Sequence, residues 1–304
     1  MSIITILGLL KVTVSQWRRD QASLMAAALA YYTVFSLAPL LIIVIAIAGA
    51  VFGEQAAKGE LVTQIQGAIG KEAAQFIQTA IENASQLNPN RGLIPTLINI
   101  AVLFFGASVI FGQLQTSLNR IWDVQPKPGN SILHFLRKRF LSFSMVLVVA
   151  FLLLVSLVIS TLLVILGNYL RDLIPGFTYL WQFFNFLVSF GIVTLLFAMI
   201  FKILPDAKIA WKDVWMGAAI TAVLFDIGKS LLGFYLGHTT FASVYGAAGS
   251  LAIILTWVFY SAQILFLGAE FTQVYVRKWG KEIVPDEYAI RIPKNTPSEA
   301  ERSL

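Results

Sequence analysis

The stretch VWMGAAITAVLFDIGKSLLGFY, from Val214 to Tyr235, decides the fold class because it is long and apolar enough to cross a bilayer. It contains two ionisable residues, Asp226 and Lys229. An ionisable side chain near the bilayer centre costs at least about 2.5–3.5 kcal/mol, so its presence needs a reason. Asp226 and Lys229 share one helix face. They are interpreted either as a structural pair that neutralises itself or as part of a site that binds or moves a substrate.

The composition indicates a membrane protein. The chain has 304 residues, of which 58% are hydrophobic and 12% are charged, whereas a soluble domain carries about 25% charged residues. It contains no cysteine, which excludes disulfides and thiol chemistry. The net charge of +6 does not indicate nucleic acid binding, because the basic residues follow the ends of apolar stretches, where anionic headgroups attract them.

The pattern of apolar residues predicts an all-α polytopic protein with six transmembrane helices. The predicted spans are about 22–52, 93–117, 140–167, 180–203, 212–236 and 248–276. Each is long enough to cross a hydrocarbon core of about 30 Å. We expect one membrane-embedded domain over residues 1–284, followed by a polar cytoplasmic tail over residues 285–304 that is disordered.

The distribution of basic residues predicts the orientation. With both termini in the cytoplasm, the inner segments hold every Lys and Arg except Lys58, Lys71, Arg91, Arg171 and Lys229. Cytoplasmic loops carry this excess in membrane proteins.

Two segments outside the spans show helical periodicity. Ile3, Ile6, Leu10 and Trp17 repeat at helical spacing, which predicts either a short helix in the cytoplasmic interface or a loose terminus. The outer segment 54–91 predicts two amphipathic helices with a break at Gly70. These helices would lie on the membrane or cap the bundle.

The first span contains a candidate hinge or cavity wall. Pro39 removes a backbone donor and should kink the helix, and the hydroxyls of Tyr32 and Ser36 could satisfy the loosened backbone. The alternative is a packing helix with a structural kink.

Candidate residues also lie around the last span. Gly246 and Gly249 come at its start, where bare helix N–H groups favour an anion such as phosphate, or where the chain makes an ordinary turn. Glu270 is expected to bond to another helix, to reach the interface or to line a cavity. Arg120, Trp122 and Asp123 are expected to anchor the second span at the headgroups, and polar residues within spans such as Gln115 and Gln263 to bond across helices.

Signs of an enzyme are lacking in the sequence. It has no Walker loop, no G-x-S-x-G elbow and no H-E-x-x-H motif. The two histidines, His134 and His238, fall on opposite sides of the membrane in the predicted topology. We therefore expect no catalytic residues, no metal site and no cofactor.

Several short segments follow one another in a recognisable order: Leu29-Ala30-Tyr31-Tyr32, Ser36-Leu37-Ala38-Pro39, Asn119-Arg120-Ile121-Trp122, Leu204-Pro205-Asp206-Ala207 with Trp211, Gly217-Ala218, Tyr245-Gly246-Ala247-Ala248-Gly249-Ser250 and Gly268-Ala269-Glu270. In the order and spacing of these segments, the chain resembles the YihY/BrkB family of bacterial inner-membrane proteins over about residues 10–280.

The resemblance implies an envelope protein located in the bacterial inner membrane. Some members of the family are associated with virulence or serum resistance, and others with moving lipids or lipopolysaccharide precursors across the inner membrane. The ribonuclease BN label carried by many members does not fit a chain without a soluble histidine and aspartate cluster.

The residues and the resemblance together predict a transporter or lipid translocator. Its polar cavity would be lined by Asp226, Lys229 and Glu270. Membrane lipids are the expected partners, a lipid or anionic envelope precursor is the candidate substrate, and nucleic acid is not expected. The oligomeric state is unassigned. The alternatives are a non-transporting scaffold, a protein of the virulence or serum-resistance type, and a membrane enzyme.

The orientation can be tested with reporter fusions. A reporter fused after Arg302 should be active in its cytoplasmic form, and one inserted near Asn83 should read as external, because of the asymmetry of basic residues. The opposite reading at either position would overturn the predicted topology.

Overall fold

The computed structural model describes residues 3–69, 71–85, 93–127, 177–237, 247–280 and 283–292, with a few helical positions between 144 and 159. This part of the chain is mainly helical. The helices are α1 (Ile3–Arg19), α2 (Ala22–Phe52), α3 (Glu54–Ile69), α4 (Lys71–Ser85), α5 (Leu93–Ile121), α7 (Phe177–Ile203), α8 (Trp211–Gly237) and α10 (Ala247–Trp279). The strands are β1 (Val124–Pro126), β2 (Ala207–Lys208), β3 (Val284–Pro285) and β4 (Ala289–Arg291).

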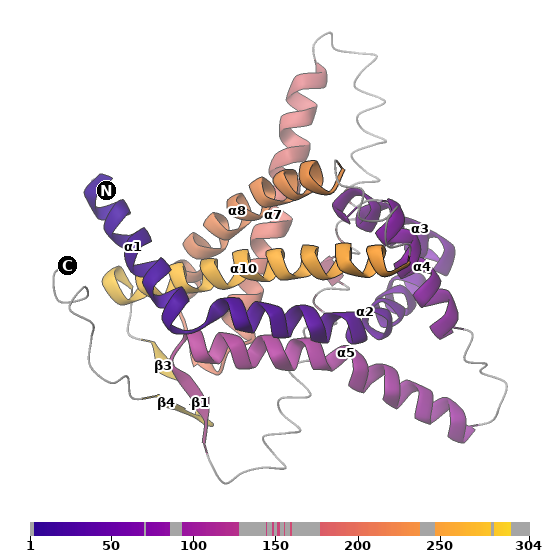
Figure 1. Ribbon diagram of the computed structural model, residues 1–304, viewed down its shortest axis with the longest axis horizontal. Coiled ribbons are helices and arrows are strands. Elements are labelled where there is room, and N and C mark those ends of the chain that lie inside the picture. Colours follow the sequence, from indigo (N-terminus) through magenta and orange to yellow (C-terminus); the bar gives the residue numbers. More distant parts are fainter. Residues whose placement is uncertain are drawn as a thin grey trace.

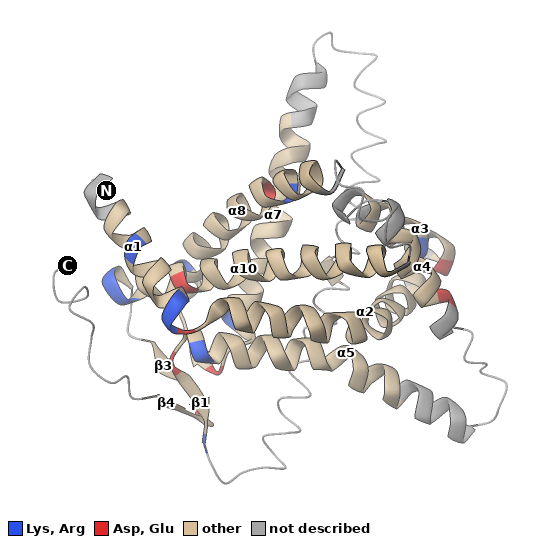
Figure 2. Cartoon of the chain, in the orientation of Figure 1, with Lys and Arg blue, Asp and Glu red and all other residues tan. Residues whose placement is uncertain are grey.

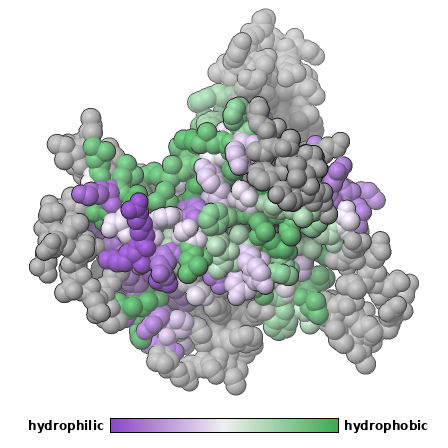
Figure 3. Space-filling model, in the orientation of Figure 1, coloured by the Kyte–Doolittle hydropathy of each residue, from purple (hydrophilic) through white to green (hydrophobic). Residues whose placement is uncertain are grey.

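Five of these helices, α2, α5, α7, α8 and α10, are long and apolar enough to cross a membrane. They correspond to five of the predicted spans, so the all-α polytopic fold class is confirmed. The remaining span, 140–167, lies almost entirely outside the described residues, and the number of six stays a prediction. Helices α2, α5 and α10 run side by side (Figure 1). Hydrophobic residues cover much of the flank of the bundle (Figure 3).

Helix α2 contacts α5 at the predicted kink. Pro39 lies inside α2, which stays continuous around it. A Cβ atom added at Gly106 of α5 would lie 2.9 Å from Cγ of Pro39, closer than carbon atoms normally approach. Gly106 therefore leaves the room that the proline ring needs.

Helices α8 and α10 make a closer and reciprocal contact. A Cβ atom added at Gly217 of α8 would collide with the side chain of Thr272 of α10, and one added at Gly268 of α10 would collide with that of Thr221 of α8. Each threonine hydroxyl donates to the carbonyl of the glycine on its own helix, at 2.7 Å for Thr221 and 2.6 Å for Thr272. Small residues that let backbones approach are a common basis of helix association in lipid.

Helices α3 and α4 cap one end of the bundle. The turn at Gly53, whose φ of 87° is in the region that favours glycine, sends α3 back over α2. Leu61 of α3, together with Ile77 and Ile81 of α4, packs against Ile45 of α2 and Ile253 of α10. The two predicted outer helices are present, and of the two expected placements the structure shows the cap. Gly70, the predicted break, lies outside the described residues.

The opposite end is closed by α1 and the short strands (Figure 1). Strand β1 pairs with β4, and β2 pairs with β3, both antiparallel. Residues 283–292 therefore join the segments that follow α5 and α7. The prediction of disorder from residue 285 is wrong over this part, because these backbone groups find partners far away in the sequence. Positions 293–304 lie outside the described residues.

The close contact between α8 and α10 predicts a sharp difference between two glycines of one helix. Gly217→Ala should lower the stability by about 1–3 kcal/mol, because the added methyl group overpacks the contact with Thr272. Gly233→Ala should leave the melting temperature unchanged or raise it, since nothing lies within 4 Å of its added Cβ and alanine favours the helix.

The measurement is thermal unfolding of the purified variants in detergent. Adding Thr272→Ala to Gly217→Ala should recover part of the loss, because the colliding hydroxyl and methyl groups are removed. Equal melting temperatures for Gly217→Ala and Gly233→Ala would contradict the contact.

Candidate functional site

Asp226 and Lys229 lie in the second half of α8, on the flank of the bundle. Asp226 is half-buried and Lys229 is exposed. No ion pair joins them to each other or to any other residue of the described part of the chain, although the Ser230 hydroxyl donates to the main-chain oxygen of Asp226 at 3.0 Å. Neither charge is therefore neutralised by an ion pair within the described residues.

Aromatic packing ends directly before these charges. The ring of Phe225 lies between Phe197 of α7 and Trp257 of α10, with centroid distances of 5.6 and 6.2 Å. Lys229 follows Phe225 by four residues and so lies on the same side of α8. Lys229 therefore lies one helical turn beyond the aromatic contact that joins α7, α8 and α10.

Glu270 belongs to a different part of the bundle. It is fully buried in α10, at the level of α8 where Gly217 and Thr221 make their contacts. Asp226 lies about five residues beyond Thr221, which is roughly 7–8 Å along the helix axis. Gly228 packs instead against Tyr260 and Ile264, further along α10. The structure does not bring Glu270 together with Asp226 and Lys229.

The other predicted site residues are spread over the molecule. Tyr32 is exposed and its ring contacts that of Tyr31, whereas Ser36 is buried. Pro39 packs on Gly106 as described. Gly249 is buried in the first turns of α10, and Gly246 lies outside the described residues.

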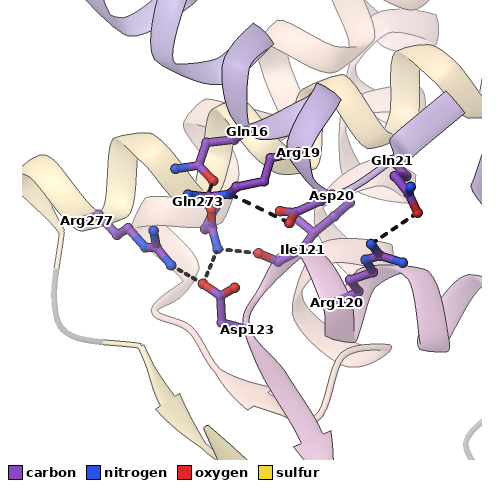
Figure 4. Close-up of polar contacts among 9 residues, drawn as sticks. All are labelled: Gln16, Arg19, Asp20, Gln21, Arg120, Ile121, Asp123, Gln273 and Arg277. Carbon is purple, nitrogen blue, oxygen red and sulfur yellow. Dashed lines mark hydrogen bonds and ion pairs between the residues drawn. The ribbon is translucent and has the colours of Figure 1, made fainter. Parts of the chain in front are cut away.

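A buried polar layer closes the end of the bundle beside α1. Asp123, in the turn after α5, accepts hydrogen bonds from Gln273 Nε2 at 3.0 Å and from the guanidinium of Arg277, both on α10. Gln273 also donates to the carbonyl of Ile121. The backbone N–H of Ile292 donates to the carbonyl of Asp123 at 2.8 Å. Figure 4 shows Asp123 held in this way between α5 and α10.

Asp206 forms the second centre of this layer. Its carboxylate accepts from Asn119 Nδ2 at 2.7 Å and from Gln115 Nε2 at 3.2 Å, and its backbone N–H donates to Asn119 Oδ1 at 2.8 Å. The N–H of Asp286 donates to the Asp206 carbonyl at 2.9 Å. Buried carboxylates are stable when several donors reach them. The prediction that polar residues of the spans bond across helices is confirmed for Gln263 of α10, whose Nε2 donates to Ser23 Oγ of α2 at 2.9 Å.

The prediction that Arg120, Trp122 and Asp123 anchor a helix at the headgroups is wrong for two of them. Trp122 and Asp123 are buried, at 2% and 6% exposure. Arg120 is exposed and donates to Gln21 at 3.4 Å (Figure 4). The partners of Asp123 lie some 150 residues further along the chain, so no local pattern marks it as buried.

Charge is concentrated at the same end. Figure 2 shows Lys and Arg gathered around α1, the last turn of α10 and the end of α5. Arg19 of α1 donates to Gln16 and approaches Asp20 at 4.0 Å. Within the described residues, no group of three or more His, Asp or Glu side chains could hold a metal ion. In the described part of the chain, the polar layer joins α5 and α10 to the connecting strands.

Comparison with known proteins places this chain in a family. The family model described as virulence factor BrkB matches residues 13–291. The chain belongs to this family. It is therefore an integral membrane protein of the BrkB type, and the resemblance seen in the sequence is confirmed.

Its relatives are named UPF0761 membrane proteins. One from Pseudoalteromonas translucida is 28% identical over 83% of this chain and 81% of its own length. One from Mannheimia succiniciproducens is 28% identical over 85% of this chain and 86% of its own length. The match spans only 59% of a relative from Acinetobacter baylyi, which is 23% identical over 84% of this chain. No solved structure matches.

The polar layer predicts a large effect from one buried amide. Asn119→Leu should lower the stability by about 1–3 kcal/mol, because it leaves the buried Asp206 carboxylate without its shortest hydrogen bond. Asn185→Leu, the same replacement at an exposed position of α7, should leave the stability nearly unchanged. Thermal unfolding in detergent measures both. Equal melting temperatures would contradict the structural role of the layer.

Proposed function

We propose that this protein is a translocator of lipids or other amphiphiles in the bacterial inner membrane, with both termini in the cytoplasm. The observation that carries the proposal is the position of Asp226 and Lys229. They stand on the flank of a helix able to cross a membrane, and no ion pair neutralises either within the described residues. Charges placed against hydrocarbon are costly, so a polar group of another molecule, or of another segment, is needed beside them.

The surroundings of the two charges favour an amphiphile as that molecule. Ile227, Leu231 and Phe234 are exposed on the same half of α8. An acyl chain can lie along these side chains within the bilayer while a charged headgroup meets Asp226 and Lys229. A fully polar substrate would gain nothing from such an apolar flank.

The proposal assigns no catalytic role. Glu270 and the buried carboxylates Asp123 and Asp206 lie inside the packed end of the bundle, away from the exposed flank of α8. Amide and guanidinium groups donate to Asp123 and Asp206, which suits structural use. That the chain is not an enzyme remains a prediction.

The two charges should be required for transport and not for folding. In proteoliposomes that contain a fluorescent phospholipid, the wild-type protein should make the inner-leaflet label accessible to an external quencher. The double variant Asp226→Asn with Lys229→Gln should insert normally and flip the lipid about tenfold more slowly, since 1.36 kcal/mol in a barrier is tenfold in rate. Lys212→Gln, an exposed lysine in the first turn of α8, is the matched control.

Other outcomes have definite meanings. If the double variant flips lipid at the wild-type rate, Asp226 and Lys229 take no part in the mechanism. Single variants that unfold while the double variant is stable would show a structural pair, because each single change leaves one unpaired charge. If the wild-type protein moves no lipid, the result would favour a non-transporting envelope protein.

A further inference from the structure

A cavity of about 370 Å³ lies between α2, α3 and α4, at the end of the bundle away from the polar layer. Its lining combines membrane-type and charged residues. The lining residues are Ile42, Ile45, Ala46, Gly49, Ala50, Glu54, Lys58 and Ile81. This volume is large enough for part of a lipid molecule.

The apolar wall of the cavity continues a membrane-spanning surface. Ile42, Ile45 and Ala46 belong to the second half of α2, which is one of the helices able to cross a membrane. Ile81 of α4 closes the wall from the side of the cap. The wall therefore leads from the flank of the bundle toward its capped end, a direction that suits an acyl chain.

The rim of the cavity is charged. Glu54 opens α3, and Lys58 follows it by four residues on the same helix face. Lys58 Nζ lies 3.4 Å from Glu82 Oε1 of α4, and Gln78 Nε2 donates to the same oxygen at 3.0 Å. Hydrogen bonds from Gln78 and Lys58 hold the pKa of Glu82 below its usual range, which keeps this carboxylate charged.

The charged residues at the rim favour one chemical type of lipid headgroup. Glu82 is engaged by Lys58 and Gln78, whereas Glu54 has no hydrogen bond or ion pair within the described residues. Glu54, Lys58 and the neighbouring Glu82 together carry a net charge of about −1 near neutral pH. A purely anionic headgroup is repelled there, and a headgroup that carries a cation and an anion finds a partner for each.

We propose that the cavity binds a phospholipid with a primary ammonium headgroup. The ammonium meets Glu54, the phosphate meets Lys58, and the start of an acyl chain lies along Ile42, Ile45 and Ala46. This inference rests on the proposed function in one respect: it takes the bound lipid to be the lipid that the protein moves. Binding is measured without transport, so the two can fail separately.

The experiment is native mass spectrometry of the full-length protein with phosphatidylethanolamine, phosphatidylglycerol or phosphatidylcholine added in detergent. The wild-type protein should bind phosphatidylethanolamine about tenfold more tightly than phosphatidylglycerol, equivalent to roughly 1.4 kcal/mol. Phosphatidylcholine should also bind more weakly, because its quaternary ammonium has no N–H to donate. Glu54→Gln should abolish this preference while leaving the melting temperature unchanged.

A second variant tests the cavity itself. Ala46→Trp should fill the apolar part and reduce phosphatidylethanolamine binding at least about tenfold. Ala27→Trp, at an exposed alanine of the same helix outside the cavity, and Glu287→Gln, at an exposed acid near the opposite end, should bind as the wild type does.

Three results would overturn the inference: equal binding of the three lipids, preferential binding of phosphatidylglycerol, or unchanged binding in both Ala46→Trp and Glu54→Gln. Selective binding in a protein that moves no lipid would overturn the proposed function alone. Lipid movement without selective binding would overturn the cavity as the substrate site alone.

Discussion

The interlock of α8 and α10 at Gly217, Thr221, Gly268 and Thr272 sets the geometry on which the rest of the structure depends. Lipid gives little hydrophobic drive to helix association, so shape and backbone proximity decide which faces meet. Here one residue pair on each helix fixes both the rotation and the relative height of α8 and α10. The buried Glu270 of α10 lies at the level of this contact, and Gly228 keeps α8 against α10 further along, while Asp226 and Lys229 lie on the outer side of α8.

Charged residues in this fold are handled in two opposite ways. Asp123 and Asp206 are buried, and amide or guanidinium donors from distant segments reach both. Such satisfied groups stabilise one arrangement of helices and need nothing from outside. Asp226, Lys229 and Glu54 have no ion pair among the described residues and are half-buried or exposed. In a membrane protein, charges of this second kind mark where another molecule or segment is needed, which is why both proposals rest on them.

The sequence predicts what depends on local pattern. Length and hydropathy are enough for the bounds of α2, α7, α8 and α10, because a bilayer sets the length of a span. Helical periodicity is enough for α1 and for the pair α3 and α4. The polar layer could not be predicted, since Asp123 and Gln273 are joined only by the fold. The strands of residues 283–292 have two or three residues each and no alternation to detect. The cavity depends on the turn at Gly53 that lays α3 over α2, and its single local sign is the spacing of Glu54 and Lys58.

The two proposed lipid contacts both lie toward the capped end of the bundle. Lys229 lies eight residues before the end of α8, about two helical turns from the capped end of the bundle. Helix α3, which carries Glu54 and Lys58, contacts α8 as well as α2. The cap formed by α3 and α4 carries the second of these contacts. These two helices place the charged rim directly above the apolar wall of α2, and neither surface alone could hold both ends of a lipid.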